Sequence, residues 1–144
     1  MALPRALCGG FPRAQNRVIE LHDSKLRSWE RMPAGELVLR LSAVVHVSAG
    51  APGVAAGTVW AQEISLRIAA ASLAQEPLGP LWIDDGWLEI GEQRLESLLP
   101  FPLEKQGPVR IRLFGGEGEL CATGDGVILE TLGEPTFIER FEKA

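Results

Sequence analysis

Residues 35–50, GELVLRLSAVVHVSAG, alternate between apolar and more polar side chains along their whole length. One parity carries apolar residues only, namely Leu37, Leu39, Leu41, Ala43, Val45 and Val47. The other parity holds Arg40, Ser42, His46 and Ser48, together with Val38 and Val44. Successive side chains of a strand point to opposite faces of a sheet, so this pattern predicts one long bent strand or two consecutive strands with a buried face.

Similar short segments follow one another along the rest of the chain. The strict alternation from Trp60 to Ile68 favours a strand, although the alanines at 69–71 would also suit a helix. Other predicted strands, separated by Gly, Pro and Asp, are 17–23, 25–32, 109–115, 119–124, 127–133 and 135–144. This spacing predicts an all-β fold, an antiparallel sandwich or barrel, with one short helical turn around residues 91–99.

The segment 82–91, WIDDGWLEIG, places two tryptophans around two aspartates and a glycine. Asp85–Gly86 predicts a two-residue hairpin turn, because both residue types tolerate positive φ angles. The hairpin would make Trp82 and Trp87 a cross-strand pair that contributes about 0.2–1 kcal/mol. The alternative is an aromatic platform for a sugar ring or flat ligand. The ligand-binding candidates are Trp82, Asp84, Asp85 and Trp87, together with Trp60 and Gln62 beside the glycine-rich loop 49–58.

The composition is that of an ordinary globular protein. The chain has 144 residues, of which 46% are hydrophobic and 23% charged. This length predicts a single all-β domain over residues 17–144, and prolines and glycines in residues 1–16 predict a flexible arm rather than a signal peptide. The net charge of −5 gives no support for a nucleic-acid or membrane partner. No apolar run is long enough for a transmembrane helix.

Cysteine usage favours a reducing compartment. Cys8 lies in the expected arm and Cys121 in a predicted strand, so both are expected to be free thiols. The chain has no CxxC pair, which removes zinc-finger and thioredoxin-like interpretations. We therefore expect a cytoplasmic protein.

The two histidines form the main candidate for chemistry. His22 and His46 share the more polar parity of their predicted strands. If those strands are neighbours, His22, Asp23 and His46 would make a small metal site or an acid/base pair, because two histidines and one carboxylate compose a facial triad. The spacing carries no helix- or loop-based signature, and a solvent-facing histidine on a half-exposed sheet is the simpler alternative.

Other catalytic and cofactor motifs are missing from the sequence. The glycine-rich segment FGGEGEL lacks the third glycine of a dinucleotide fingerprint, and the chain has no Gly-Lys-Ser/Thr of a P-loop. There is no GxSxG, and Cys121 has no histidine near it in sequence. We therefore expect no cofactor and no nucleophilic catalysis.

The C-terminal segment GEPTFIERFEKA carries apolar residues on both parities. Phe137, Glu139 and Phe141 share one parity, and Ile138 and Arg140 share the other. Such a strand suits a covered position, either inside the domain or against a second copy of the chain. A homodimer through this strand is therefore one expectation.

Four stretches resemble small conserved bacterial proteins of unknown function. They are VVHVSAGAPGVAAGTVWAQEISLRI, IDDGWLEIG, LLPFPLEKQGPVRIRL and GEPTFIERF. The resemblance covers most residues after about Arg17. It implies a bacterial origin and an all-β domain, and it carries no active-site residues across.

The leading functional hypothesis is a non-enzymatic binding or interaction module that acts through loops near Trp60 and Trp82–Trp87. Two alternatives stay open. One is a small metal-dependent or acid/base enzyme that uses His22, Asp23 and His46. The other is a structural subunit of a larger assembly, for which an exposed apolar patch on the last strand would be the sign.

Overall fold

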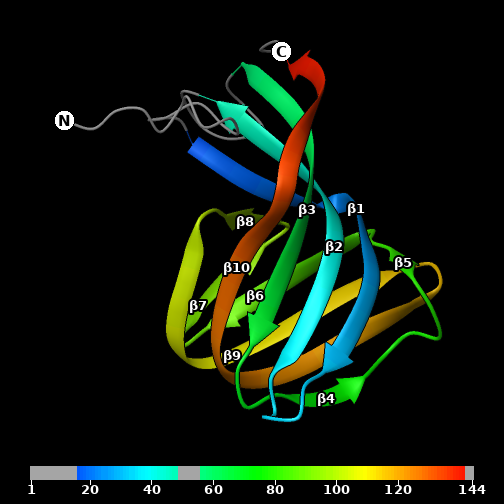
Figure 1. Ribbon diagram of the computed structural model, residues 1–144, viewed down its shortest axis with the longest axis vertical. Coiled ribbons are helices and arrows are strands. Elements are labelled where there is room, and N and C mark those ends of the chain that lie inside the picture. Colours follow the sequence, from blue (N-terminus) through cyan, green and yellow to red (C-terminus); the bar gives the residue numbers. More distant parts are fainter. Residues whose placement is uncertain (1–15, 49–55, 142–144) are drawn as a thin grey trace.

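The computed structural model describes residues 16–48 and 56–141, and this part of the chain is all-β with no helix. Its ten strands form one strongly curled antiparallel sheet, a half-barrel, shown in Figure 1. The all-β antiparallel prediction is confirmed. The predicted arm 1–16 lies, except for Asn16, outside the described residues. The strands are β1 Asn16–Arg31, β2 Leu37–Ser48, β3 Gly57–Ile68, β4 Ser72–Gln75, β5 Leu81–Trp82, β6 Asp85–Ile90, β7 Gln93–Glu96, β8 Leu98–Pro100, β9 Leu103–Gly115 and β10 Gly118–Phe141.

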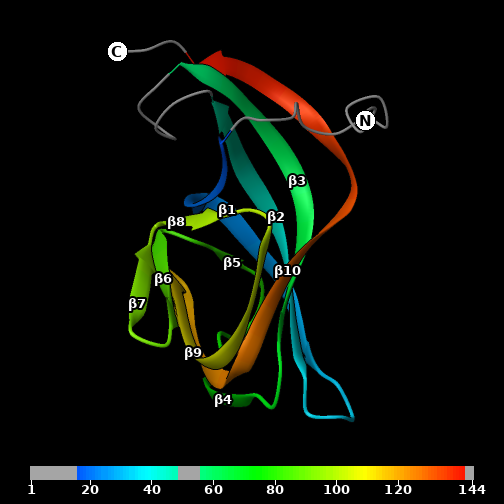
Figure 2. The same cartoon turned by 90° about the vertical axis from the view of Figure 1, so that its left-hand side faces the viewer.

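The strand order explains the curl of the sheet. The order is β5-β1-β2-β3-β10-β9-β6-β7, while β4 also pairs with β10 and β8 with β1. Because β8 follows β7 directly and pairs with β1, the two ends of the sheet approach each other, as the side view in Figure 2 shows. The sheet thus wraps around its own apolar face, which becomes the core.

The apolar parity of β2 lies in the core, as the alternation predicts. Leu37, Leu39 and Leu41 are at most 1% exposed and lie opposite Ile68, Leu66 and Ile64 of β3. All six residues of the apolar parity of β2 belong to the core cluster. The alternation from Trp60 to Ile68 likewise forms a strand, β3, as predicted. Period-two patterning therefore identified the central strands and their buried face.

Three predicted breaks between strands are bulges inside long strands. The segments 17–23 and 25–32 form the single strand β1, with Asp23 at a φ of 73° near their junction. The segments 119–124, 127–133 and 135–141 likewise form the single strand β10, with Gly126 at a φ of 131°. Positive φ suits a bulge as well as a turn, so turn residues alone do not separate the two structures.

The predicted Asp85–Gly86 hairpin is wrong. Both residues lie within β6 and pair with Phe114 and Leu113 of β9. Gly86 is not among the glycines at positive φ. Its Cβ, if present, would stand 2.6 Å from the carbonyl oxygen of Arg112. The glycine therefore permits close approach of two strands rather than a tight turn.

The predicted helical turn around residues 91–99 is also wrong. After a turn at Gly91, residues 93–96 form β7, which pairs with β6 from Trp87↔Glu96 to Ile90↔Gln93. Residues 98–100 form β8 on β1. Pairing with neighbouring strands overrides the helical propensity of this short segment.

The ends of β2, β3 and β10 lie together at one end of the sheet, where residues 16–20 of β1 also pair with β2. We call residues 44–48 of β2, 57–63 of β3 and 130–141 of β10 the extension. Figures 1 and 2 show it as the narrow upper part of the molecule. Here β3 lies between β2 and β10 in the strand order.

Candidate functional site

The bulge of β1 positions His22 and Asp23. Glu20 lies opposite Val44 and Lys25 opposite Ser42, so residues 21–24 face Ala43 alone. The backbone of the bulge instead meets the segment around Ile83. Asp23 N–H donates to the Ile83 carbonyl at 3.2 Å, and Ile83 N–H donates to the Ser24 carbonyl at 2.9 Å. His22 and Asp23 are exposed, whereas the flanking Leu21 and Ser24 are buried.

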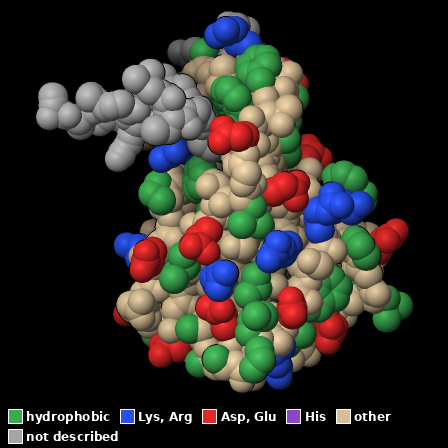
Figure 3. Space-filling model, viewed as in Figure 1, with side chains coloured by type: hydrophobic (Ala, Val, Ile, Leu, Met, Phe, Trp, Pro, Cys, Tyr) green, Lys and Arg blue, Asp and Glu red, His purple; other side chains and the backbone are tan. Residues whose placement is uncertain are grey.

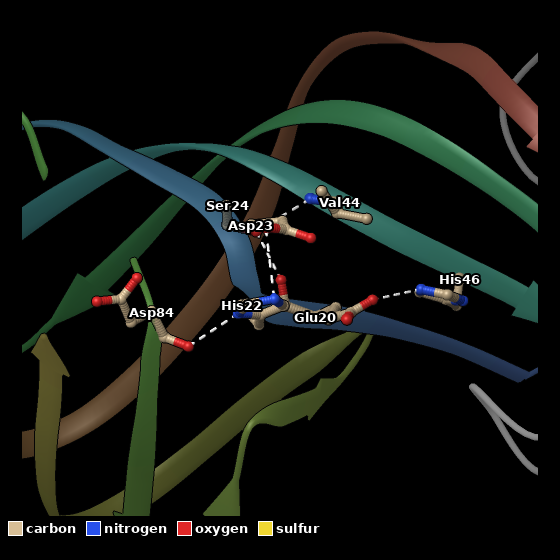
Figure 4. A network of polar contacts seen from close by, with 7 residues as sticks. All are labelled: Glu20, His22, Asp23, Ser24, Val44, His46 and Asp84. Carbon is tan, nitrogen blue, oxygen red and sulfur yellow. Dashed lines mark hydrogen bonds and ion pairs between the residues drawn. The ribbon is translucent and has the colours of Figure 1, made fainter. Parts of the chain in front are cut away.

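The Ser24 hydroxyl holds the bulge on β2, as Figure 4 shows. Its Oγ donates to the Glu20 carbonyl at 2.6 Å and accepts from the Val44 N–H at 3.0 Å. Ser24 is fully buried. The hydroxyl therefore replaces the ladder hydrogen bonds that the extra residues interrupt.

We expect Ser24→Ala to lower the free energy of unfolding by about 1–3 kcal/mol, because it leaves the partly buried Val44 N–H and Glu20 carbonyl without this partner. Urea unfolding followed by fluorescence measures this loss. Ser65→Ala is the matched control: Ser65 is also buried, and its Oγ has no hydrogen-bond partner in the described structure. Equal effects of the two substitutions would show that the Ser24 hydroxyl does not hold the bulge.

His46 is paired with a residue that sequence analysis missed. Its Nε2 contacts the Glu20 carboxylate in Figure 4, and both side chains are largely buried. His46 lies opposite Val18 in the register, which makes Glu20 its diagonal neighbour on the same face of the sheet. Glu20 and His22 share a parity, but only the register across the bulge shows which carboxylate reaches His46.

His22 contacts a different part of the chain. Its Nδ1 lies 3.0 Å from the Asp84 carbonyl oxygen, so this nitrogen donates, and its Nε2 lies 3.5 Å from the Asp23 carboxylate. The hydrogen bond to the Asp84 carbonyl, followed by the negative charge of Asp23, raises the pKa of His22 above its ordinary value. Both causes favour the imidazolium form.

We expect NMR titration of His22 to give a midpoint above 6.5, the ordinary pKa of a histidine side chain. Because the folded pKa is raised, the stabilisation is fully present below the unfolded pKa and is lost as pH rises through the folded pKa. Asp23→Asn should lower the midpoint only in part, since the Asp84 carbonyl remains. His46→Gln assigns the signals, as the chain has two histidines. A midpoint at or below 6.5 in the unmodified chain would contradict this geometry.

The structure does not bring His22, Asp23 and His46 together as one group. The strands of the two histidines are neighbours, as the hypothesis required, but each histidine has its own carboxylate. Within residues 16–48 and 56–141, no group of three or more His, Cys, Asp or Glu side chains is arranged to hold a metal ion. The polar contacts of these residues hold the bulge of β1 in place.

Trp82 and Trp87 contact different cations. Trp82 is 63% exposed, and the Lys25 Nζ lies 5.0 Å from the centre of its ring. Trp87 lies between two guanidinium groups, those of Arg94 at 4.1 Å and Arg110 at 5.6 Å. These cation–π contacts and the absence of a hairpin explain why the two rings do not form the predicted cross-strand pair.

The aspartates between the two tryptophans differ in role. Asp85 accepts hydrogen bonds from the Ser97 hydroxyl at 2.7 Å and the Gly86 N–H at 2.8 Å. It therefore stabilises the start of β6. Asp84 is exposed, and its backbone carbonyl accepts from His22.

Gln62 and Trp60 lie in the extension on its inner face. Gln62 is 2% exposed, and its Nε2 donates to the carbonyls of Leu132 and Gly133, at a bulge of β10. The Trp60 ring meets Phe137 edge-on, with 5.5 Å between ring centres. Both predicted ligand-binding residues thus attach β10 to β3.

The far part of β10 has an open edge. Pairing with β9 ends at Leu129↔Leu103, whereas pairing with β3 continues to Phe141↔Gly57. We call Glu130–Phe141 the open edge, because among the described residues no strand pairs with its other side. Phe137 is 51% and Ile138 47% exposed here. Figure 3 shows hydrophobic side chains on this narrow part of the molecule.

Comparisons of this chain with protein-family models, curated proteins and solved structures found no match. The resemblance to small bacterial proteins therefore stays a prediction. The part of the chain that the structure describes contains no helix long and apolar enough to cross a membrane.

Proposed function

We propose that this protein is a non-enzymatic interaction module that binds a polypeptide along the open edge of β10. The observation that carries the proposal is the combination of an unpaired strand edge with two half-exposed large apolar side chains, Phe137 and Ile138. Unpaired N–H and C=O groups of an edge strand can accept a further strand, and exposed side chains beside them supply specificity.

The apolar side chains supply the driving force. Fully burying a residue such as Phe or Ile contributes roughly 1.5–3 kcal/mol, so covering the exposed halves of two residues contributes about half of that for each. Phe137 is already oriented by its contact with Trp60. A preoriented ring loses less side-chain freedom when a partner binds.

The same edge carries features that limit indiscriminate pairing. Pro135 lacks an N–H, Glu134 and Glu139 add charge, and the register of β10 is interrupted between Leu132 and Thr136 and between Phe137 and Glu139. Prolines, charges and bulges are the means by which proteins prevent edge-to-edge aggregation. Their presence supports a selective interaction rather than indiscriminate pairing of strand edges.

A metal-dependent or acid/base enzyme is less well supported. His22 and His46 are engaged separately, with Asp84 and Glu20 respectively. The structural-subunit alternative uses the same open edge and differs from the proposal only in the size of the assembly.

Site-specific photocrosslinking in the cells that make the protein tests the proposal. A photoreactive phenylalanine analogue replaces Phe137 in one variant and Leu78 in the control variant. Leu78 is the matched control, because it is fully exposed and lies in the β4–β5 connection, outside the open edge. We expect a discrete adduct from position 137 that position 78 does not give. No adduct at 137, or the same adducts at both positions, would overturn the proposal.

A further inference from the structure

We infer that the polypeptide bound at the open edge is a second copy of this chain, paired antiparallel with Phe137 opposite Phe137. The inference rests on the proposed function and names its partner. Two identical edge strands in one sheet pair antiparallel around a two-fold axis perpendicular to the sheet. Each residue then faces the position at the same distance on the other side of the axis, where distance is counted in paired positions of β3, because the register of β10 is interrupted at residues 133–135 and at Ile138.

Charge complementarity selects the register. On β3, Arg140 lies opposite Thr58 and the interrupted stretch 133–135 lies at Gln62, so each is two positions from Trp60↔Phe137. With Phe137 at the axis, Arg140 of each copy therefore faces the stretch of the other copy that contains Glu134, which gives two ion pairs. Moving the axis by one paired position, to Thr136 or Glu139, places Arg140 opposite Thr131 or Phe137, and both ion pairs are lost. The side chains of Glu134 and Arg140 are exposed, and neither has an ion-pair partner within the described structure. Their charges are therefore available to a second copy.

The remaining contacts of this register fit as well. Thr136 lies opposite Glu139, one paired position from the axis on either side, so no two like charges face each other directly. Like charges directly opposite one another in a sheet destabilise the pair, whereas opposite charges stabilise it. Phe137, half-exposed in one copy, meets its own counterpart at the axis.

The topology closes the assembly at two copies. The strands at the two ends of the sheet order, β5 and β7, span only 2 and 4 residues. Shorter stretches that pair on one side occur at residues 27–31 of β1 and 103–108 of β9, and the open edge is longer than either of them. Both copies use this longest edge of the described residues. An interface formed by the same patch on both subunits closes into a dimer instead of growing into a filament.

Charge reversal at the two positions gives a test with an internal control. Glu134→Arg and Arg140→Glu each place like charges opposite one another in a dimer of identical copies. A mixture of the two variants restores both ion pairs in a dimer with one copy of each. Sedimentation equilibrium and native mass spectrometry of the full chain measure the association, and unfolding curves check that the variants fold.

We expect the unmodified chain to dimerise, each single variant to associate at least tenfold more weakly, and the equimolar mixture to recover a one-to-one dimer. A monomeric unmodified chain, or variants and mixture that all associate alike, would overturn the inference. If a variant does not fold, amide exchange of the unmodified chain decides. Protection of residues 136–141 that rises with concentration supports the dimer, and protection independent of concentration refutes it.

The two proposals fail in different ways. A crosslink from position 137 to a protein of another mass, with a monomeric purified chain, refutes the second-copy inference and keeps the interaction module. A crosslinked product of twice the chain mass supports both. Absence of any specific crosslink together with a monomeric chain removes both.

Discussion

Leu39→Ala is expected to lower the free energy of unfolding by about 2–5 kcal/mol, the range for removing a buried leucine from a well-packed core. Leu39 is 0% exposed and lies between Trp29 of β1 and Leu66 of β3. Three neighbouring strands therefore meet at this side chain. The truncated residue leaves a cavity that the curled sheet cannot close without moving its strands.

Urea unfolding followed by tryptophan fluorescence measures the effect of Leu39→Ala. Leu78→Ala is the control, because Leu78 is fully exposed and its truncation should change stability by less than about 0.5 kcal/mol. A loss at Leu39 no larger than the loss at Leu78 would show that the inner face of β2 is not the core.

Gly115→Ala is expected to have the second largest effect, at the upper end of the range of about 1–3 kcal/mol for overpacking. A Cβ at Gly115 would stand 2.1 Å from the backbone carbonyl oxygen of Trp82. A backbone atom cannot rotate away as a side chain can, so β5 would have to separate from β9. This contact helps to close the curl of the sheet.

Gly116→Ala is the control for Gly115→Ala, because it makes the same chemical change at the neighbouring position with nothing within 4 Å of the added Cβ. We expect the Gly116 variant to unfold at nearly the same urea concentration as the unmodified chain. Equal stabilities of the two variants would contradict the close packing of β5 on β9.

The core was predictable because one chemical signal dominates there. A buried face requires apolar residues at every second position. The strand β2 obeys this rule over its whole length and β3 obeys it from Ile64 to Ile68, whereas Gln62 of β3 is a buried polar side chain. The signal depends on side chains alone, so it needs no knowledge of which strands are neighbours.

The turns were not predictable, because a single residue type serves several backbone structures. Asp23 and Gly126 adopt positive φ within continuous strands, where a turn would require the same conformation. Position 86 needs a glycine for another reason, because a Cβ there would clash with the carbonyl oxygen of Arg112. Which of these requirements applies depends on long-range pairing, which local sequence does not encode.

The candidate sites show the same limit. Parity placed His22 and His46 on the polar faces of neighbouring strands, but the partner of His46 is Glu20, its diagonal neighbour in the register of β1 on β2. Phe137 and Ile138 were expected in a strand covered either inside the domain or by a second copy, and within the described chain both are half-exposed on the open edge. Exposure of a strand edge is a property of topology, and sequence pattern alone does not give it.

Amide hydrogen exchange of β10 in dilute solution, followed by NMR, tests the open edge most directly. Val127, Ile128 and Leu129 lie between β3 and β9 and serve as the internal reference for a strand paired on both sides. We predict slow exchange for these residues, and a set of amides within Glu130–Phe141 that exchange nearly as fast as unprotected peptide. Uniform slow exchange from Val127 to Phe141 in the dilute monomer would show that the edge is already covered, and would contradict the account.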